Sequence, residues 1–261
     1  MKALSIAATG MLSQQLNVEV IANNIANLNT TAFKRQRAEF QDLLYQNIER
    51  VGANSSDAGT IVPTGIQIGV GVKTASVYRI TDQGNLVSTG NTYDMAVNGR
   101  GFFRIELPTG ELGYTRAGAF QLGPQGQIVT AEGYIVQPSI SIPQEALDVT
   151  INQQGEVQAA LAGQIDQQIL GRFELILFPN EAGLEAIGGN LFLETAASGA
   201  ANVGSPNTPG FGTIVQGFLE TSNVNAVTEI TGLITAQRAY EMNSRVIATA
   251  DEMMASVSNL R

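Results

Sequence analysis

The sequence predicts an α+β fold, with terminal helices packed as a coiled-coil-like layer and a mainly β central domain. Apolar residues recur at alternating steps of three and four near both termini, and strand-like segments separated by glycine-bearing turns lie between them. We therefore expect four parts: an N-terminal helix at 1–30, a connecting segment with an extended loop at 31–65, a β-rich domain at 66–220, and a C-terminal helix at 221–261.

The terminal spacing places each apolar set on one helix face, in the seam positions of a coiled coil. Polar Gln14 and Asn243 fall inside these seams and are expected to fix the register. Two such helices packed only on each other would expose much apolar surface, which favours assembly of several chains, although ordinary helix packing within a monomer remains an alternative. The expected subunit-assembly residues are Leu4, Ala7, Met11, Val18, Ile21, Ile25 and Leu28 in the first helix, and Leu233, Ala236, Tyr240, Ile247, Ala250, Met254 and Val257 in the second.

Local signals predict where the elements begin and end. The first helix should cover 1–28 and stop at the asparagines that follow. Asn225 suits the N-cap of the last helix, with Glu229 favoured in its first turn by the helix dipole. A rough apolar face also suggests a second helical segment over 33–50. The stretch 52–63 begins with small polar residues and is expected to form an extended loop.

The composition leaves few routes to catalysis. The chain has no cysteine, histidine or tryptophan, which removes thiol nucleophiles, thiolate metal sites and the commonest general base. Carboxylate pairs remain, but no aromatic-rich cleft is indicated around them. We expect no catalytic residue, no metal site and no cofactor, and a secreted carboxylate-dependent hydrolase is the alternative enzyme class.

The formal net charge of −9 is unevenly distributed. Residues 51–220 have a balance of −9, whereas 1–50 have +1 and 221–261 have −1. Nucleic acid is not an expected partner, because phosphate binding needs concentrated positive charge. No apolar run approaches the roughly 20 residues of a membrane span, so no membrane insertion is expected. The apolar stretch at 3–8 is too short for a signal peptide, and any export should leave the N-terminus uncleaved.

Two kinds of short motif have structural and functional interpretations. Segments 69–71 and 98–101 are glycine-rich, but each precedes strand-like sequence rather than a helix. They are therefore more typical of turns or bulges than of phosphate loops. The basic cluster Lys34-Arg35-Arg37 is interpreted as a solvated helix face, with salt bridges at a subunit contact as the alternative.

Several long motifs resemble one protein family, the bacterial flagellar axial proteins of the rod and hook class. Residues 21–35 are similar to the N-terminal signature of that class, and Ala32 stands where the signature has glycine. A left-handed turn at Ala32 would be strained, so we expect helical or extended backbone there. Matching motifs span nearly the whole chain, at 8–11, 21–35, 96–103, 114–120, 217–225 and 237–244.

Within this family the chain most resembles the distal-rod subunit, with hook and proximal-rod subunits as alternatives. The resemblance implies a structural protein that forms a rigid helical homopolymer around an export channel and transmits torque. The implied partners are proximal-rod and hook-side axial proteins, the outer ring (bushing) proteins and the flagellar type III export apparatus. The implied location is the basal-body rod that crosses the periplasm. The resemblance also suggests that the loop at 52–63 wedges between adjacent subunits.

Overall fold

The computed structural model describes residues 2–49, 64–161 and 166–259. The chain divides into two compact units. Unit 1 comprises Met1–Ala26, Gln36–Tyr78 and Asn225–Arg261, and unit 2 comprises Asn27–Arg35 and Arg79–Val224. The predicted α+β class is confirmed, because long helices form at both ends and the described residues between them are mainly β. The predicted extended loop at 52–63 lies outside the described residues.

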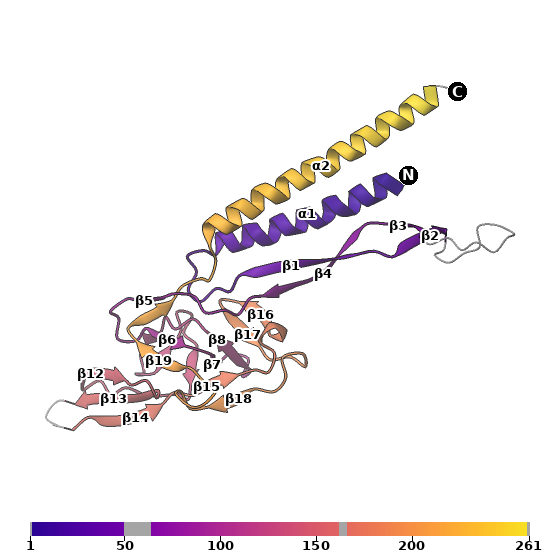
Figure 1. The fold of residues 1–261 in the computed structure, drawn as a ribbon. Helices are drawn as coiled ribbons and strands as arrows, with labels where there is room; N and C mark the ends of the chain where they lie inside the picture. The colour runs from indigo at the N-terminus through magenta and orange to yellow at the C-terminus, as the bar shows by residue number, and fades with distance from the viewer. Residues whose placement is uncertain (1, 50–63, 162–165, 260–261) are drawn as a thin grey trace. The chain divides into compact units, whose positions relative to one another are not determined.

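Unit 1 combines two long helices with paired strands. Helix α1 spans Lys2–Ala26 and α2 spans Ala226–Asn259. Figure 1 shows α1 alongside α2, with the start of α1 and the end of α2 at the same end of the pair. The strands are β1 (Gln36–Asp42), β2 (Tyr45–Glu49), β3 (Ile66–Gly69) and β4 (Val72–Arg79), paired as β1 with β4 and β2 with β3. Helix α1 contacts both α2 and β1.

The start of α2 agrees with its predicted cap. The Asn225 Oδ1 accepts a hydrogen bond from the backbone N–H of Thr228 at 3.2 Å, and the Asn225 carbonyl accepts one from Glu229 N at 3.0 Å. The side-chain bond satisfies a donor that has no partner inside the helix, and the backbone bond is the first bond of the helix itself. The N-cap prediction is confirmed, and Glu229 lies in the first turn as expected.

The helical prediction for 33–50 is wrong, because this stretch contains β1 and β2. Along β1 the burial alternates between half-buried and exposed over its first five residues, which is the period of a strand. Its partner β4 begins about 30 residues later, and Leu43 N also donates to Gly71 O at 2.8 Å. A partner at this distance in sequence overrides the weak local helical pattern.

Unit 2 is built from short strands, and every strand pairing recorded for its described residues is antiparallel. A seven-stranded sheet has the order β16-β17-β8-β7-β11-β10-β9, a three-stranded sheet the order β12-β13-β14, and pairs form between β15 and β18, β19 and β6, and β20 and β5. A short 3₁₀ helix covers Glu181–Gly183. The strands are β5 (Leu86–Ser88), β6 (Met95–Asn98), β7 (Phe103–Glu106), β8 (Leu112–Thr115), β9 (Gln121–Leu122), β10 (Ile128–Val129), β11 (Ile135–Gln137), β12 (Ala146–Ile151), β13 (Glu156–Leu161), β14 (Gln168–Arg172), β15 (Leu175–Leu177), β16 (Glu185–Gly188), β17 (Leu191–Leu193), β18 (Asn202–Gly204), β19 (Thr213–Gln216) and β20 (Phe218–Glu220).

The main core of unit 2 joins side chains from several of these sheets. Phe103 and Phe120 meet edge to face, with ring centroids 5.2 Å apart, and both are almost fully buried. The close packing also depends on Gly118, since a Cβ there would lie 1.5 Å from the carbonyl oxygen of Met95. A second buried cluster surrounds Phe102 and Phe178.

Residue Ala32 corrects the expectation for the segment after α1. Its φ is 56°, so its backbone is left-handed rather than helical or extended. This conformation costs an L-residue roughly 1–2 kcal/mol. The Ala32 N–H donates to the Glu220 carbonyl at 2.8 Å, and only 4% of the residue is exposed. Tertiary hydrogen bonding and burial therefore offset the local strain that the sequence argument treated as decisive.

Candidate assembly surfaces

Helices α1 and α2 pack antiparallel within unit 1. Gly10 lies against Asn243, and Gly232 lies against Ile21, so positions that advance along α1 meet positions that recede along α2. A Cβ on Gly10 would lie 2.9 Å from Asn243 Nδ2, which shows how closely the helices approach there. Asn243 therefore occupies the helix interface, as its predicted seam position implies.

A buried polar network fixes the other end of the helix pair. The Asn24 Nδ2 donates to the Glu229 Oε2 at 3.1 Å and to the Gln36 carbonyl at 2.8 Å, while Asn24 Oδ1 accepts from Gln36 N at 2.8 Å. Only 1% of Asn24 and 2% of Glu229 are exposed. One amide thus joins α1, β1 and α2, and its directional bonds specify their register within unit 1.

The predicted assembly residues are distributed over three environments. Ala7, Ile21, Ala236 and Ala250 are buried in the single chain, while Leu4, Met11, Val18, Ile25, Leu233 and Ile247 are half-buried. Tyr240 is 43% exposed and Met254 38% exposed. Leu28 follows the end of α1 and belongs to unit 2, and the side chain of Val257 lies outside the described residues. Their role in subunit assembly stays a prediction.

The glycine contacts predict different outcomes for two matched substitutions. Gly232→Ala should raise the free energy of unfolding by up to about 1 kcal/mol, because alanine favours a helix and its Cβ would meet Ile21 Cδ1 at an ordinary 3.5 Å. Gly10→Ala should instead lower the free energy of unfolding by about 1–3 kcal/mol, because Asn243 must move. Urea unfolding followed by far-UV circular dichroism measures both.

The cause of that difference can be isolated with a double variant. Adding Asn243→Ala should remove most of the penalty of Gly10→Ala, because the amide that it displaces is then absent. Additive effects of Gly10→Ala and Asn243→Ala, or equal effects of Gly10→Ala and Gly232→Ala, would contradict the close approach of Gly10 and Asn243.

A second apolar face on α2 was missed by the seam analysis. We call it the outer stripe, and its large side chains are all at least 47% exposed. At about 100° per residue Val227, Ile230 and Ile234 project away from the face that carries Ala236 and Asn243, whereas Met242, Val246 and Met253 lie on one flank of that face. An exposed apolar strip of this kind marks an interaction surface. The outer stripe comprises Val227, Ile230, Ile234, Met242, Val246 and Met253. The sequence signal for the outer stripe was the second set of apolar residues between the seam positions.

The pair formed by β2 and β3 exposes a further apolar set. Leu44, just before β2, is 87% exposed, and large residues of both strands are at least 37% exposed: Tyr45, Ile48, Ile66 and Ile68. A two-stranded pair in water is marginally stable without a packing partner. This surface therefore also suits burial against another chain.

A buried ionic cluster in unit 2 was likewise missed. The Glu220 carboxylate receives Lys34 Nζ on Oε1 and Arg116 Nε on Oε2, each at 2.6 Å, and Gly84 N donates to Oε1 at 2.8 Å. The side chains of Lys34 and Arg116 are each 5% exposed, and that of Glu220 is 0% exposed. Burial lowers the pKa of the Lys34 ammonium, and Glu220 opposes that shift. Both interpretations of Lys34 as part of a surface cluster are wrong, because it is buried within unit 2.

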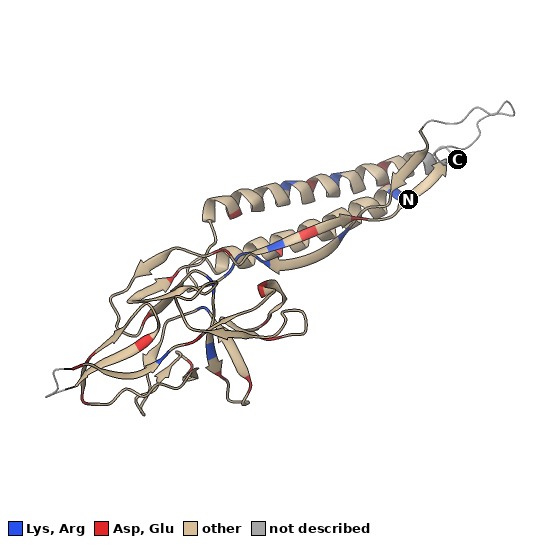
Figure 2. Ribbon diagram, turned by 60° about the horizontal axis from the view of Figure 1, so that its bottom comes forward, with Lys and Arg blue, Asp and Glu red and all other residues tan. Residues whose placement is uncertain are grey.

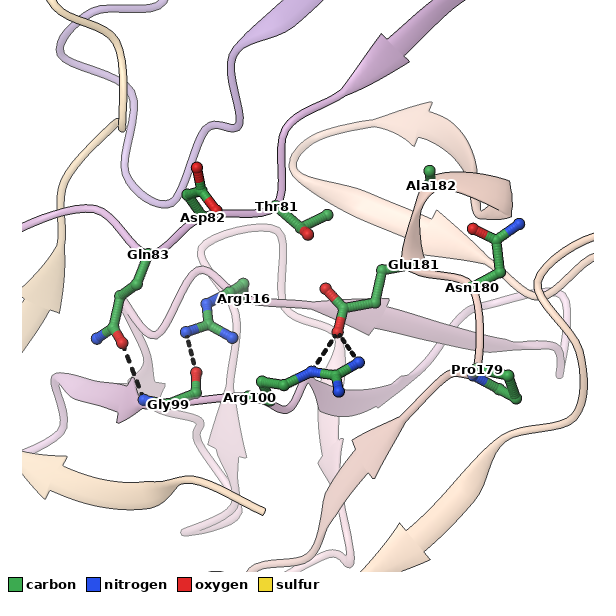
Figure 3. A pocket seen from close by; sticks show the side chains of 10 residues that line it. All are labelled: Thr81, Asp82, Gln83, Gly99, Arg100, Arg116, Pro179, Asn180, Glu181 and Ala182. Atoms are coloured by element: carbon green, nitrogen blue, oxygen red, sulfur yellow. Dashed lines mark hydrogen bonds and ion pairs between the residues drawn. The ribbon is translucent and has the colours of Figure 1, made fainter. Parts of the chain in front are cut away.

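The same cluster adjoins an open pocket of about 530 Å³, drawn in Figure 3. Arg100 extends along its wall and pairs with Glu181 at 2.8 Å. Arg116 donates to the carbonyls of Val97, Gly99 and Gly101 as well as to Glu220. The cations of this pocket are thus already engaged by carboxylates and backbone oxygens. The segment 98–101 forms part of a turned wall and does not open a helix.

Charged residues are sparse along both helices (Figure 2). Helix α1 carries only Lys2 and Glu19, and α2 carries six charged residues over 34 positions. Within the described ranges no helix is long and apolar enough to cross a membrane. The described residues also contain no group of three or more acidic side chains placed to hold a metal ion.

Three family models and several curated relatives match this chain. The family model for flagella basal body rod proteins matches residues 4–34, that for the flagellar hook protein FlgE/F/G D1 domain matches 96–159, and that for the flagellar basal body rod FlgEFG protein C-terminal matches 215–260. The flagellar basal-body rod protein FlgG of Caulobacter vibrioides is 62% identical over 100% of both chains. That of Agrobacterium fabrum is 54% identical over 99% of this chain and 98% of the relative, and that of Bacillus subtilis is 37% identical over 100% and 99%.

Proposed function

Because the chain belongs to the flagellar basal-body rod protein family, as a structural subunit of the distal rod and not an enzyme, we propose that its copies assemble into a rigid helical tube. In this proposal 1–30 and 221–261 form an inner helical layer around an export channel. Residues 66–220 form the outer wall, and 31–65 connect the two. The tube transmits torque towards the hook.

The exposed apolar surface of unit 1 supports this proposal most directly. The outer stripe of α2 and the apolar side chains of β2 and β3 are of the kind that a soluble monomer normally covers. Burial of each large apolar side chain stabilises by roughly 1.5–3 kcal/mol. Contacts between copies would bury both surfaces, so assembly has a clear driving force.

The proposed partners follow from a place in the distal rod. Copies of this chain contact each other along the tube, proximal-rod proteins at one end and hook-side axial proteins at the other. The outer ring (bushing) proteins surround the rod where it crosses the periplasm. The flagellar type III apparatus exports the chain without cleaving its N-terminus. The uneven charge agrees with this arrangement, because the acidic excess lies in the segment proposed to face outward.

Electron microscopy of basal bodies from a strain that lacks the gene tests the proposal. We expect rods that stop short and carry no hook, and the gene supplied in trans should restore full length. Complete rods that lack only the hook would instead assign the chain to the hook. Loss of the whole rod would assign it to the proximal rod, and normal motile flagella would contradict a rod function.

A further inference from the structure

A small cavity in unit 2 lies beside the buried ionic cluster. Its volume is about 10 Å³, which is roughly the space that one water-sized sphere needs. Thr81, Arg116 and Glu181 line both this cavity and the open pocket of Figure 3, so the two spaces adjoin. Three cations face the cavity: Lys34, Arg79 and Arg116. A concentration of positive charge around so small a space raises the question of what balances it.

Arg79 brings a guanidinium that has no anionic partner in this part of the chain. Among the described residues no hydrogen-bond acceptor or carboxylate pairs with it, and its Cζ lies 5.5 Å from the centre of the Phe192 ring. Burial lowers the pKa of this guanidinium, and here, unlike at Lys34, no carboxylate opposes that shift. A half-buried cation of this kind is stabilised by an anion within its reach.

The other polar groups of the cavity also keep unused donors. The Lys34 ammonium has three N–H donors, and two of them bond, to the Glu220 Oε1 and to the Asp82 carbonyl. Arg116 has five N–H donors, of which four bond. The Thr81 hydroxyl makes no hydrogen bond within the described residues. Donors therefore outnumber acceptors around the cavity.

The charges that surround the cavity and the open pocket sum to +1. They comprise the cations Lys34, Arg79, Arg100 and Arg116 and the carboxylates Asp82, Glu181 and Glu220. Two of the carboxylates are already paired, since Glu220 bonds two cations and Glu181 bonds Arg100. One monovalent anion in the cavity would bring the whole group to neutrality, which is the usual state of buried charge in proteins.

We propose that this cavity binds one monatomic anion, chloride, held by Arg79, the Thr81 hydroxyl and the remaining donors of the ionic cluster. A phosphate or sulfate ion carries four oxygens around its centre and does not fit in a space of this size. Part of the wall is apolar and comes from Phe102, Leu184 and Phe192. Such a wall favours a weakly hydrated halide, chloride or bromide, over the strongly hydrated fluoride ion.

A water molecule is the other occupant that the size of the cavity allows. Water must donate hydrogen bonds as well as accept them, whereas the side chains here offer mainly donors. Glu181 is the exception, and its Oε1 already accepts from Nε and Nη2 of Arg100. Water would also leave the net charge of the group unbalanced. The surplus of donors and of positive charge therefore selects the anion.

Binding is tested by chloride NMR line broadening on the purified full-length chain. We expect broadening that saturates with chloride and is reversed by bromide, but not by fluoride or sulfate at equal ionic strength. Arg79→Gln should weaken the affinity about tenfold or more, and Thr81→Val about threefold or more, because each removes a bond to the ion. Arg172→Gln and Thr213→Val remove the same groups elsewhere in unit 2 and should leave the affinity unchanged.

Crystals of the chain soaked in sodium bromide locate the ion directly. An anomalous diffraction peak in the cavity is expected for the unaltered chain and should be lost in Arg79→Gln. Circular dichroism of each variant checks that it remains folded. Broadening that is absent, or that the two cavity variants leave unchanged, would mean an adventitious ion only and would overturn the site. A water molecule in the cavity without a bromide peak would overturn it as well.

Discussion

Replacing Glu220 by alanine is expected to lower the free energy of unfolding by about 3–5 kcal/mol. The substitution leaves Lys34 and Arg116 buried with no carboxylate between them, and Gly84 N loses its acceptor. The large effect comes from the stranded charges and not from the intact ion pairs, whose net contribution is offset by desolvation. Urea unfolding of the purified chain measures the loss.

Two further variants separate this effect from a general loss of acidic charge. Glu220→Gln retains a hydrogen-bond acceptor and should lose less than Glu220→Ala. Glu111→Ala removes an exposed carboxylate and should change the free energy of unfolding by no more than about 0.5 kcal/mol. A Glu220→Ala chain as stable as Glu111→Ala would show that the cluster does not hold unit 2 together.

The defect of Glu220→Ala should also depend on pH. Burial lowers the pKa of Lys34 in the folded chain, so the unfolded chain binds more protons in the window between the two pKa values, and stability rises with pH there. Without Glu220, which raises the Lys34 pKa, that window becomes wider. The difference from the unaltered chain should therefore shrink as the pH rises from neutral towards 10.5, the ordinary pKa of lysine.

Ala236→Asp is expected to have the second large effect. Ala236 is 2% exposed on the face of α2 that carries Asn243, and an aspartate there would be buried without a partner. We expect a loss of about 3–5 kcal/mol in the free energy of unfolding and no rods in basal bodies viewed by electron microscopy. Because the helix pair is the proposed inner layer, stability and assembly should fail together.

The neighbouring Thr235 provides the matched control for stability. It is exposed, and its hydroxyl donates to the Thr231 carbonyl within the same helix. Thr235→Asp should therefore cost no more than about 0.5 kcal/mol. Equal unfolding midpoints for the two aspartate variants would mean that Ala236 does not lie in a closed helix interface.

Sequence reasoning succeeded where the decisive interactions are local. The spacing of three and four predicts both terminal helices, and Asn225 predicts the start of α2 to the residue. These signals depend on residues within one or two helical turns, so no knowledge of the rest of the chain was needed. Short strands in the middle were predictable as a class for the same reason.

The failures all involve distant partners. β1 forms because β4 supplies hydrogen bonds from about 30 residues away, and Ala32 is left-handed because Glu220 accepts its N–H. Lys34 is buried because Glu220, 186 positions later, neutralises it. No local pattern reports such a partner, and a lysine at the surface is the ordinary expectation.

The candidate assembly site was predictable only in part. The seam residues Ala7 and Ala236 occupy buried positions in the single chain, so their apolar character is largely explained by packing within unit 1. The outer stripe is one of the two surfaces proposed to contact other copies, and the search for one seam per helix did not consider it. A heptad pattern identifies a face that is buried, but it does not say whether the partner belongs to the same chain.

The antiparallel helix pair also dictates the order in which the protein folds. Asn24 and Glu229 are 205 positions apart, and the partner of α1 is the final helix of 34 residues. Unit 2 consists mostly of one continuous stretch, 79–224, whose contacts close shorter loops. A chain that emerges from its N-terminus first therefore completes most of unit 2 while α1 still lacks its helical partner. Unit 1 closes only after the last helix has emerged.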